Sequence, residues 1–72
     1  SVAKSEEKKA QGIVRFLFNY FYNAPKKLPY PYNEFIDKYG LKRAVSHYIA
    51  GMTDGYAIDF YSQLCIPKGW NV

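Results

Sequence analysis

The chain has 72 residues, enough for one domain, and a domain of this size buries only about 60% of the surface that its unfolded form exposes. Apolar residues make up 49% of the chain and charged residues 22%, a balance typical of a globular rather than a disordered protein. Aromatic residues make up 19%, which is more ring surface than a small isolated core usually holds. We therefore expect either many exposed rings or packing against a larger partner.

The charge and the cysteine content restrict the classes of protein further. A net charge of +4 permits an anionic partner but does not require one. The sequence has no apolar run of about 18 residues and does not begin with a signal-peptide pattern, so we expect a soluble, cytoplasmic protein with no membrane partner. The lone Cys65 excludes an internal disulfide framework and a multi-cysteine zinc site, and it fits a reducing compartment.

The first predicted helix covers residues 5–23. Its apolar stripe has helical spacing and consists of Ala10, Ile13, Val14, Leu17, Tyr20, Phe21 and Ala24. Three further rings, those of Phe16, Phe18 and Tyr22, lie on other sides of the helix, so its second half should be covered on more than one side. Pro25 ends the helix, because proline disfavours helical geometry in the residue before it.

Two more helices are predicted after an extended connector at residues 26–31. A short helix, 33–39, has Asn33 as its cap and ends at Gly40, which should adopt left-handed geometry. A long helix, 41–65, follows with an uninterrupted apolar stripe made of Leu41, Val45, Tyr48, Ile49, Met52, Tyr56, Phe60 and Leu64. Since no strand pattern occurs, the sequence predicts an all-α fold, a small bundle of about three helices.

Two glycines, Gly51 and Gly55, lie four residues apart inside this predicted long helix. Together they cost a helix about 2 kcal/mol relative to alanine, so they need a compensating role. Close packing of another helix is our first explanation, since a glycine lets a neighbouring backbone approach. A ligand or another subunit at the same face is the alternative.

The polar residues do not assemble into a catalytic or metal-binding set. His47 is the only histidine, and a metal site built on it would need carboxylates from elsewhere in the fold. Cys65 has no nearby base, and we interpret it as a small buried hydrophobe. Asp54 is interpreted as structural and Arg43 as solvated, with contact to a phosphate or an acidic partner as the alternative for Arg43.

The segment RAVSHYIAGMTDGYAIDFYSQLCIP, residues 43–67, resembles the C-terminal region of bacterial deoxyguanosinetriphosphate triphosphohydrolase-like proteins, which are HD-domain phosphohydrolases. The agreement is unbroken from Tyr48 to Asp54, and a looser resemblance covers most of the chain up to Pro67 and Trp70. The chain departs from the family pattern at His47, Gly55 and Cys65, where the family commonly has aspartate, arginine and phenylalanine. These changes remove an arginine–aspartate pair along the helix and one cation.

The resemblance implies a parent enzyme that hydrolyses deoxynucleoside triphosphates to the deoxynucleoside and inorganic triphosphate. A divalent metal, Mg²⁺ or Mn²⁺, is held in that family by histidines and aspartates of the HD motif. Those residues lie upstream in the family, and this chain contains no His-Asp pair. We therefore expect residues 1–72 to be a single C-terminal accessory domain, a fragment of a larger helical protein that lacks the catalytic HD domain and is inactive alone.

The resemblance also implies partners and contact residues. We expect the domain to bind the upstream HD domain, to form homo-oligomers and to meet a deoxynucleoside triphosphate through the parent enzyme. Arg43, Tyr48 and Asp54 are the candidates for nucleotide or interdomain contact, and no catalytic residue, metal ligand or cofactor is assigned to the chain itself. Candidate docking surfaces are the close-packing face of Gly51 and Gly55 and the rings of Phe16, Phe18 and Tyr22.

Two other functions fit the same composition. A small basic nucleic-acid binder would stack bases on its tyrosine and phenylalanine rings. It would hold phosphates with cations, namely Lys4, Lys8, Lys9, Lys26, Lys27, Lys42 and Arg43. A plain three-helix protein-interaction module would have no affinity for nucleotides. The weakness of the nucleic-acid hypothesis is that many rings fall on predicted core stripes, so few are left to stack.

Overall fold

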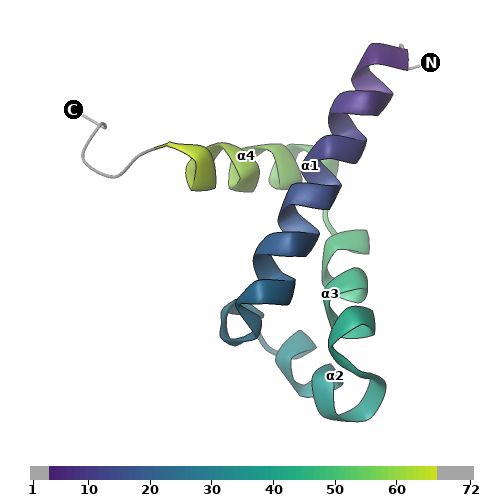
Figure 1. Ribbon diagram of the computed structural model, residues 1–72, viewed down its shortest axis with the longest axis vertical. Coiled ribbons are helices and arrows are strands. Elements are labelled where there is room, and N and C mark those ends of the chain that lie inside the picture. Colours follow the sequence, from purple (N-terminus) through teal and green to yellow (C-terminus); the bar gives the residue numbers. More distant parts are fainter. Residues whose placement is uncertain (1–3, 67–72) are drawn as a thin grey trace.

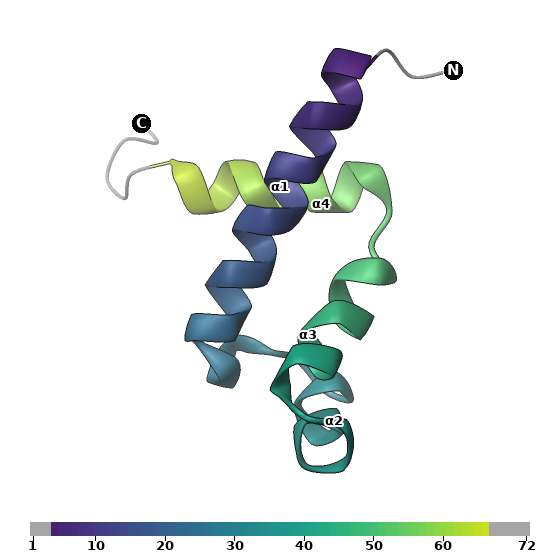
Figure 2. The same cartoon turned by 45° about the vertical axis from the view of Figure 1, so that its right-hand side comes forward.

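The computed structural model describes residues 4–66, which form four α-helices and one short 3₁₀ turn. The elements are α1 (Lys4–Asn23), η1 (Pro25–Lys27), α2 (Tyr32–Tyr39), α3 (Leu41–Ala50) and α4 (Asp54–Cys65). α3 packs on both α2 and α1, and α4 runs crosswise over α1 (Figure 1, Figure 2). These described residues contain no strand, so the predicted all-α class is confirmed.

The molecule is flat, with extents of 37 × 36 × 17 Å, and its core is correspondingly thin. The buried side chains come from α1, from α3 and from the connector after η1; they are Leu17, Phe21, Leu28, Ala44, Val45 and Ile49. The two helices meet because Leu17 and Phe21 are four residues apart on one face of α1, and Val45 and Ile49 are four apart on α3. α2 and α4 bury no residue completely.

The ring of Phe21 joins three of the helices. Its centroid lies 5.2 Å from that of Tyr48 on α3 and 5.5 Å from that of Phe60 on α4, both edge to face. Edge-to-face rings at this separation attract each other beyond the effect of their buried area. Phe21 is 1% exposed, so the aromatic cluster around it is the point that fixes α4 to the rest of the fold.

The elements before α3 follow the predictions with two corrections. α1 ends at Asn23, before Pro25, and Gly40 has a φ of 92°, as predicted for a left-handed residue. The connector at residues 26–31 is not wholly extended, since Pro25–Lys27 form a 3₁₀ turn. The predicted cap at Asn33 is also wrong: α2 begins at Tyr32 with Pro31 in the capping position.

The predicted single helix over residues 41–65 is wrong, because it is two helices separated by Gly51, Met52 and Thr53. Thr53 is extended, with φ −74° and ψ 161°, and the backbone N–H of Tyr56 donates to its hydroxyl over 3.1 Å. This threonine cap starts a new helix. Apolar periodicity did not reveal the break, because the side chains on either side of it keep the spacing of one helix.

We predict that Phe21→Ala destabilises the domain by about 3–5 kcal/mol, because it removes a fully buried ring that contacts three helices. The neighbouring change Tyr22→Ala should cost less than about 1 kcal/mol, because Tyr22 is 46% exposed. Urea unfolding followed by circular dichroism measures both. Equal losses for the two variants would contradict the position of Phe21 in the core.

Candidate functional site at the α3–α4 junction

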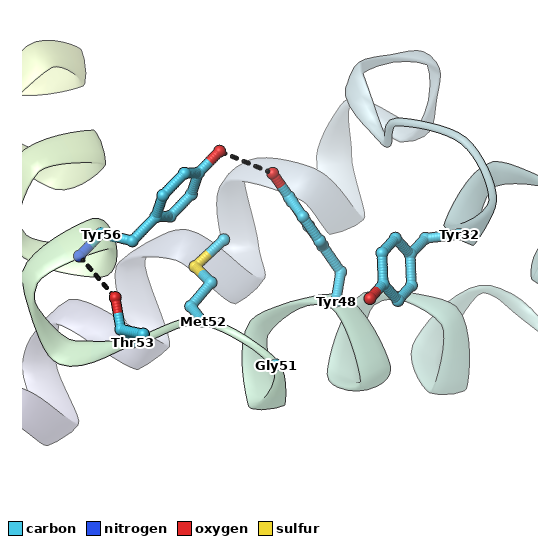
Figure 3. A pocket seen from close by; sticks show the side chains of 6 residues that line it. All are labelled: Tyr32, Tyr48, Gly51, Met52, Thr53 and Tyr56. Carbon is cyan, nitrogen blue, oxygen red and sulfur yellow. Dashed lines mark hydrogen bonds between the residues drawn. The ribbon is translucent and has the colours of Figure 1, made fainter.

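A hollow of about 200 Å³ lies where α3 gives way to α4, and α2 forms its other wall (Figure 3). Its lining residues are Tyr32, Tyr48, Gly51, Met52, Thr53 and Tyr56. Four of these six belong to the block Tyr48 to Asp54 that carries the family resemblance. The break in the predicted long helix is therefore also the place where the recognisable residues gather around a space.

Three tyrosines give the hollow its chemistry. The rings of Tyr32 and Tyr48 are 5.0 Å apart between centroids and tilted by 43°. The hydroxyls of Tyr48 and Tyr56 lie 3.4 Å apart and share a hydrogen bond that either one can donate, as Figure 3 shows. Tyr56 reaches across the gap from α4, so this contact spans the break between the two helices.

The Tyr48 hydroxyl stays neutral well beyond physiological pH. Burial raises its pKa above the ordinary value of about 10, and the hydrogen bond and charge of Tyr56 raise it further. None of the six lining residues is charged. The hollow can therefore contact a flat or apolar group and exchange hydrogen bonds through its hydroxyls.

Gly51 and Gly55, the predicted close-packing pair, occupy different environments. Gly51 ends α3 with φ −84° and ψ −4°, which any residue can adopt, and a Cβ there would lie 3.6 Å from the Tyr32 hydroxyl at the edge of the hollow. Gly55 lies in the first turn of α4, and within the described part of the chain no heavy atom lies within 4 Å of the position of its Cβ. Close packing at Gly55 stays a prediction.

Of the three predicted contact residues, the structure brings only Tyr48 into the hollow. Arg43 is exposed on α3, more than one turn before Tyr48. Asp54 is exposed at the first position of α4, where the helix dipole favours a carboxylate, so it already has a structural role. The contact roles of all three residues remain predictions.

Sequence reasoning assigned no site role to the four other side chains of the hollow, Tyr32, Met52, Thr53 and Tyr56. A signal for Thr53 was present, because a threonine followed by an aspartate, here Thr53 and Asp54, is a typical start of a helix. Tyr32 gave no such signal. It lies on α2, and only the fold brings it beside Tyr48.

His47 and Cys65, two positions that depart from the family pattern, lie away from the hollow. His47 is exposed on α3 near the rings of Phe35 and Tyr39, with centroid distances of 6.0 and 6.4 Å. Cys65 is exposed, so the prediction of a buried cysteine is wrong; α4 turns Phe60 and Tyr61 toward α1 and leaves its last residue outside. A hydrogen bond with the Cys65 thiol raises the pKa of the Tyr61 hydroxyl.

Residues 4–66 contain neither a metal-binding cluster nor a membrane-spanning helix. No three histidines, cysteines, aspartates or glutamates among them are grouped so that they could hold a metal ion. None of the helices in this range is long and apolar enough to cross a membrane. Pro67 and Trp70, which belong to the resemblance, lie outside the described residues.

Comparison with known proteins identifies the family of this chain. The model of the phosphohydrolase-associated domain matches residues 1–63, so the chain belongs to that family. This match confirms the resemblance found in the sequence. No solved structure matches the chain.

The matching curated relatives are deoxyguanosinetriphosphate triphosphohydrolase-like proteins. The one from Caldanaerobacter subterraneus is 44% identical over 70 residues, which are 97% of this chain and 21% of the relative. The one from Clostridium perfringens is 37% identical over 65 residues, 90% of this chain and 19% of the relative. The one from Leptospira interrogans is 46% identical over 52 residues, 72% of this chain and 14% of the relative. The chain thus spans about a fifth or less of the length of these relatives.

We predict that the stability of the domain falls in alkaline solution because of Tyr48. The pKa of the Tyr48 hydroxyl is higher in the folded chain than in the unfolded chain, where it has the ordinary value of about 10. The contribution of Tyr48 to the free energy of unfolding is therefore complete below a pH of about 10, and it is lost as the pH rises through the pKa of the folded chain. Urea unfolding at neutral and at alkaline pH should show a smaller loss for Tyr48→Phe and for Tyr56→Phe than for the parent chain. An identical loss in all three proteins would contradict the environment assigned to Tyr48.

We predict that Thr53→Ala costs about 1 kcal/mol of stability, because it removes the hydroxyl that accepts from the N–H of Tyr56. Thr53→Ser keeps a hydroxyl in the same place and should retain most of the stability. Thermal unfolding of the two variants measures the difference. Equal melting temperatures would show that the cap does not stabilise α4.

Proposed function

We propose that this chain is the accessory domain of a metal-dependent deoxynucleoside triphosphate triphosphohydrolase. The observation that carries the proposal is the family match over residues 1–63, in relatives named deoxyguanosinetriphosphate triphosphohydrolase-like that are several times longer. In this proposal a separate catalytic HD domain holds the divalent metal, Mg²⁺ or Mn²⁺, and performs the hydrolysis. The accessory domain supports the nucleotide pocket or a subunit interface and is inactive alone.

An exposed apolar strip along α1, formed by Val14, Phe18 and Tyr22, is the surface that we propose for the catalytic domain. These residues follow each other at four-residue steps, Val14 and Tyr22 are 47% and 46% exposed, and the rings of Phe18 and Tyr22 stack at 5.6 Å. Val14 and Phe18 also border an open region of the surface of α1, together with Glu7, Ala10, Gln11 and Arg15. An exposed apolar patch of this kind marks an interaction surface.

The ring of Phe16, also predicted for docking, has a different position. It packs edge to face on Tyr61 of α4 at 5.1 Å, although it remains 39% exposed. Phe16 therefore contributes to attaching α4 to α1. We leave it out of the proposed docking strip for this reason.

Arg43 and Asp54 remain candidates for contact with the nucleotide or with the catalytic domain. The Arg43 guanidinium is on an exposed residue of α3 and has the geometry to hold a phosphate by two hydrogen bonds. In the full-length enzyme, Arg43→Ala should raise the KM for the nucleotide if the residue meets phosphate. For Asp54, unchanged activity and unchanged assembly after Asp54→Ala would show that this residue contacts neither the nucleotide nor the catalytic domain.

The arrangement of the rings favours this proposal over nucleic-acid binding. The rings of Tyr20, Phe21, Tyr48 and Phe60 pack edge to face against one another, which leaves less of their surface free to stack on bases. A single-strand binder needs a row of accessible rings along a basic groove. Salt-sensitive binding of single-stranded DNA by the chain would restore that alternative.

We predict that the chain alone, with Mg²⁺ or Mn²⁺ present, releases no inorganic triphosphate from deoxynucleoside triphosphates. The reason is that no three metal-ligating side chains are grouped among residues 4–66. The measurement is triphosphate release over time, with the full-length enzyme as the positive control. Robust release by the chain alone would refute the accessory role.

We predict that Tyr22→Asp weakens binding to the catalytic domain at least about tenfold, because it places an unpaired charge in an apolar contact. Tyr39→Asp is the matched control, since Tyr39 is 45% exposed and Tyr22 46%, and Tyr39 lies on α2 away from the strip. Calorimetric titration of the separate catalytic domain with each variant gives the affinities. If both changes have the same effect, the strip on α1 is not the docking surface.

A further inference from the structure

α4 is attached to the rest of the fold in an unusual way. It follows a junction of only three residues, Gly51 to Thr53, and it packs on α1 through Phe60 and Tyr61. None of its side chains is fully buried. In both views of the fold α4 projects crosswise from the other helices (Figure 1, Figure 2). A helix held by so few contacts can leave its place without unfolding α1, α2 and α3.

The sequence around the junction also fits a second arrangement. Tyr48, Met52, Tyr56 and Phe60 follow one another at steps of four residues straight through the break. That spacing places all four along one side of a continuous helix. None of the junction's dihedral angles requires a glycine, because Gly51 has a negative φ. The chain over residues 41–65 is thus compatible with one straight helix as well as with two.

Two contacts hold the bent arrangement and would be absent from a straight helix. The hydroxyls of Tyr48 and Tyr56 are 3.4 Å apart, whereas eight residues of a straight helix advance about 12 Å and both side chains lean in the same direction. The Thr53 hydroxyl accepts from the N–H of Tyr56, which in a straight helix would bond the carbonyl of Met52. The bend therefore depends on a few identifiable groups.

We infer that two copies of this chain exchange α4. The junction straightens, α3 and α4 form one helix, and α4 of each copy packs on α1 of the other. Phe60 and Tyr61 then make with the second copy the contacts to Phe21 and Phe16 that they now make within one chain. The face of α1 that α4 leaves is complementary to the α4 of the second copy, because the two copies have the same sequence.

The exchange also provides a partner for side chains that are now half covered. In a two-fold dimer of this kind the straightened junctions of the two copies lie next to each other, and Tyr48, Met52 and Tyr56 form their shared contact. Tyr56 is 54% exposed in the single chain, so this contact would bury new apolar surface. The free energy gained by burying this surface offsets the loss of the Tyr48–Tyr56 hydrogen bond and of the Thr53 cap.

Two substitutions at the junction test the exchange in opposite directions. Thr53→Ala removes the cap that only the bent form uses and introduces a strong helix former, so the dimer should become about tenfold tighter or more.

Asp54→Pro places a proline at the first position of α4, where proline is tolerated. The preceding residue, Thr53, has a ψ of 161°, which suits a residue before proline. In a straight helix the same proline would clash with the carbonyl of Ala50. Asp54→Pro should therefore be monomeric.

The experiment measures the oligomeric state of the chain and of both variants by size-exclusion chromatography with light scattering over a range of concentrations. For the parent dimer, isotope-filtered NMR on a mixture of labelled and unlabelled chains should show contact between Phe16 of one copy and Tyr61 of the other. This second readout needs no substitution, so it decides the matter even if a variant does not fold. A monomer at every concentration for both the parent and Thr53→Ala, or a Phe16–Tyr61 contact only within one chain, would overturn the inference. So would a dimer of Asp54→Pro as tight as that of the parent. None of these results depends on the catalytic domain.

Discussion

The packing of the Phe21 ring is the interaction on which the rest of this fold depends. α1 and α3 bury most of the thin core between them, and α4 adds no fully buried residue of its own. The ring of Phe21 meets Tyr48 on one side and Phe60 on the other, so one buried side chain sets the position of both α3 and α4 against α1. The tyrosine-lined hollow lies at the short junction between these two helices, where Tyr56 of α4 reaches back to Tyr48 of α3.

A flat domain with such a core leaves much apolar surface uncovered. The strip of Val14, Phe18 and Tyr22 lies on α1 and the exposed Tyr56 lies on α4, and we propose a different partner for each. The strip is proposed for the catalytic domain and the junction for a second copy of the chain. Both proposals follow from the same physical fact, which is that a chain of this size cannot cover all of its rings.

The sequence predicted the helical class and most helix boundaries because those depend on local signals. Pro25 ended the first helix and Gly40 the second, each by a backbone property that the residue type determines. The boundary at residues 51–53 was missed because an apolar stripe is equally regular in one long helix and in two helices that meet at a bend. The cap at Thr53 selects two helices over one, because its hydroxyl accepts a hydrogen bond at the start of α4. In the sequence, one capping residue is a weaker signal than eight regularly spaced apolar positions.

The site was predictable only in part for a related reason. Tyr48 to Asp54 stood out as a block, yet its geometry depends on Tyr32, which lies on another helix, and on Tyr56, which reaches back across the bend. Arg43 and Asp54 were predicted from the family resemblance and the polar stripe of the predicted helix, and both are exposed outside the hollow. Residue type showed which positions were unusual, whereas the neighbours of each position followed only from the fold.

The central claim is that this domain works by binding a catalytic HD domain, and complementation in trans tests it most directly. The HD domain of the parent enzyme would be produced without residues 1–72, and triphosphate release from a deoxynucleoside triphosphate would be followed while the chain is added. The account predicts a low starting rate that rises with added chain and saturates at one accessory domain per catalytic domain. Full activity without the chain, or a rate that the chain does not change, would contradict it.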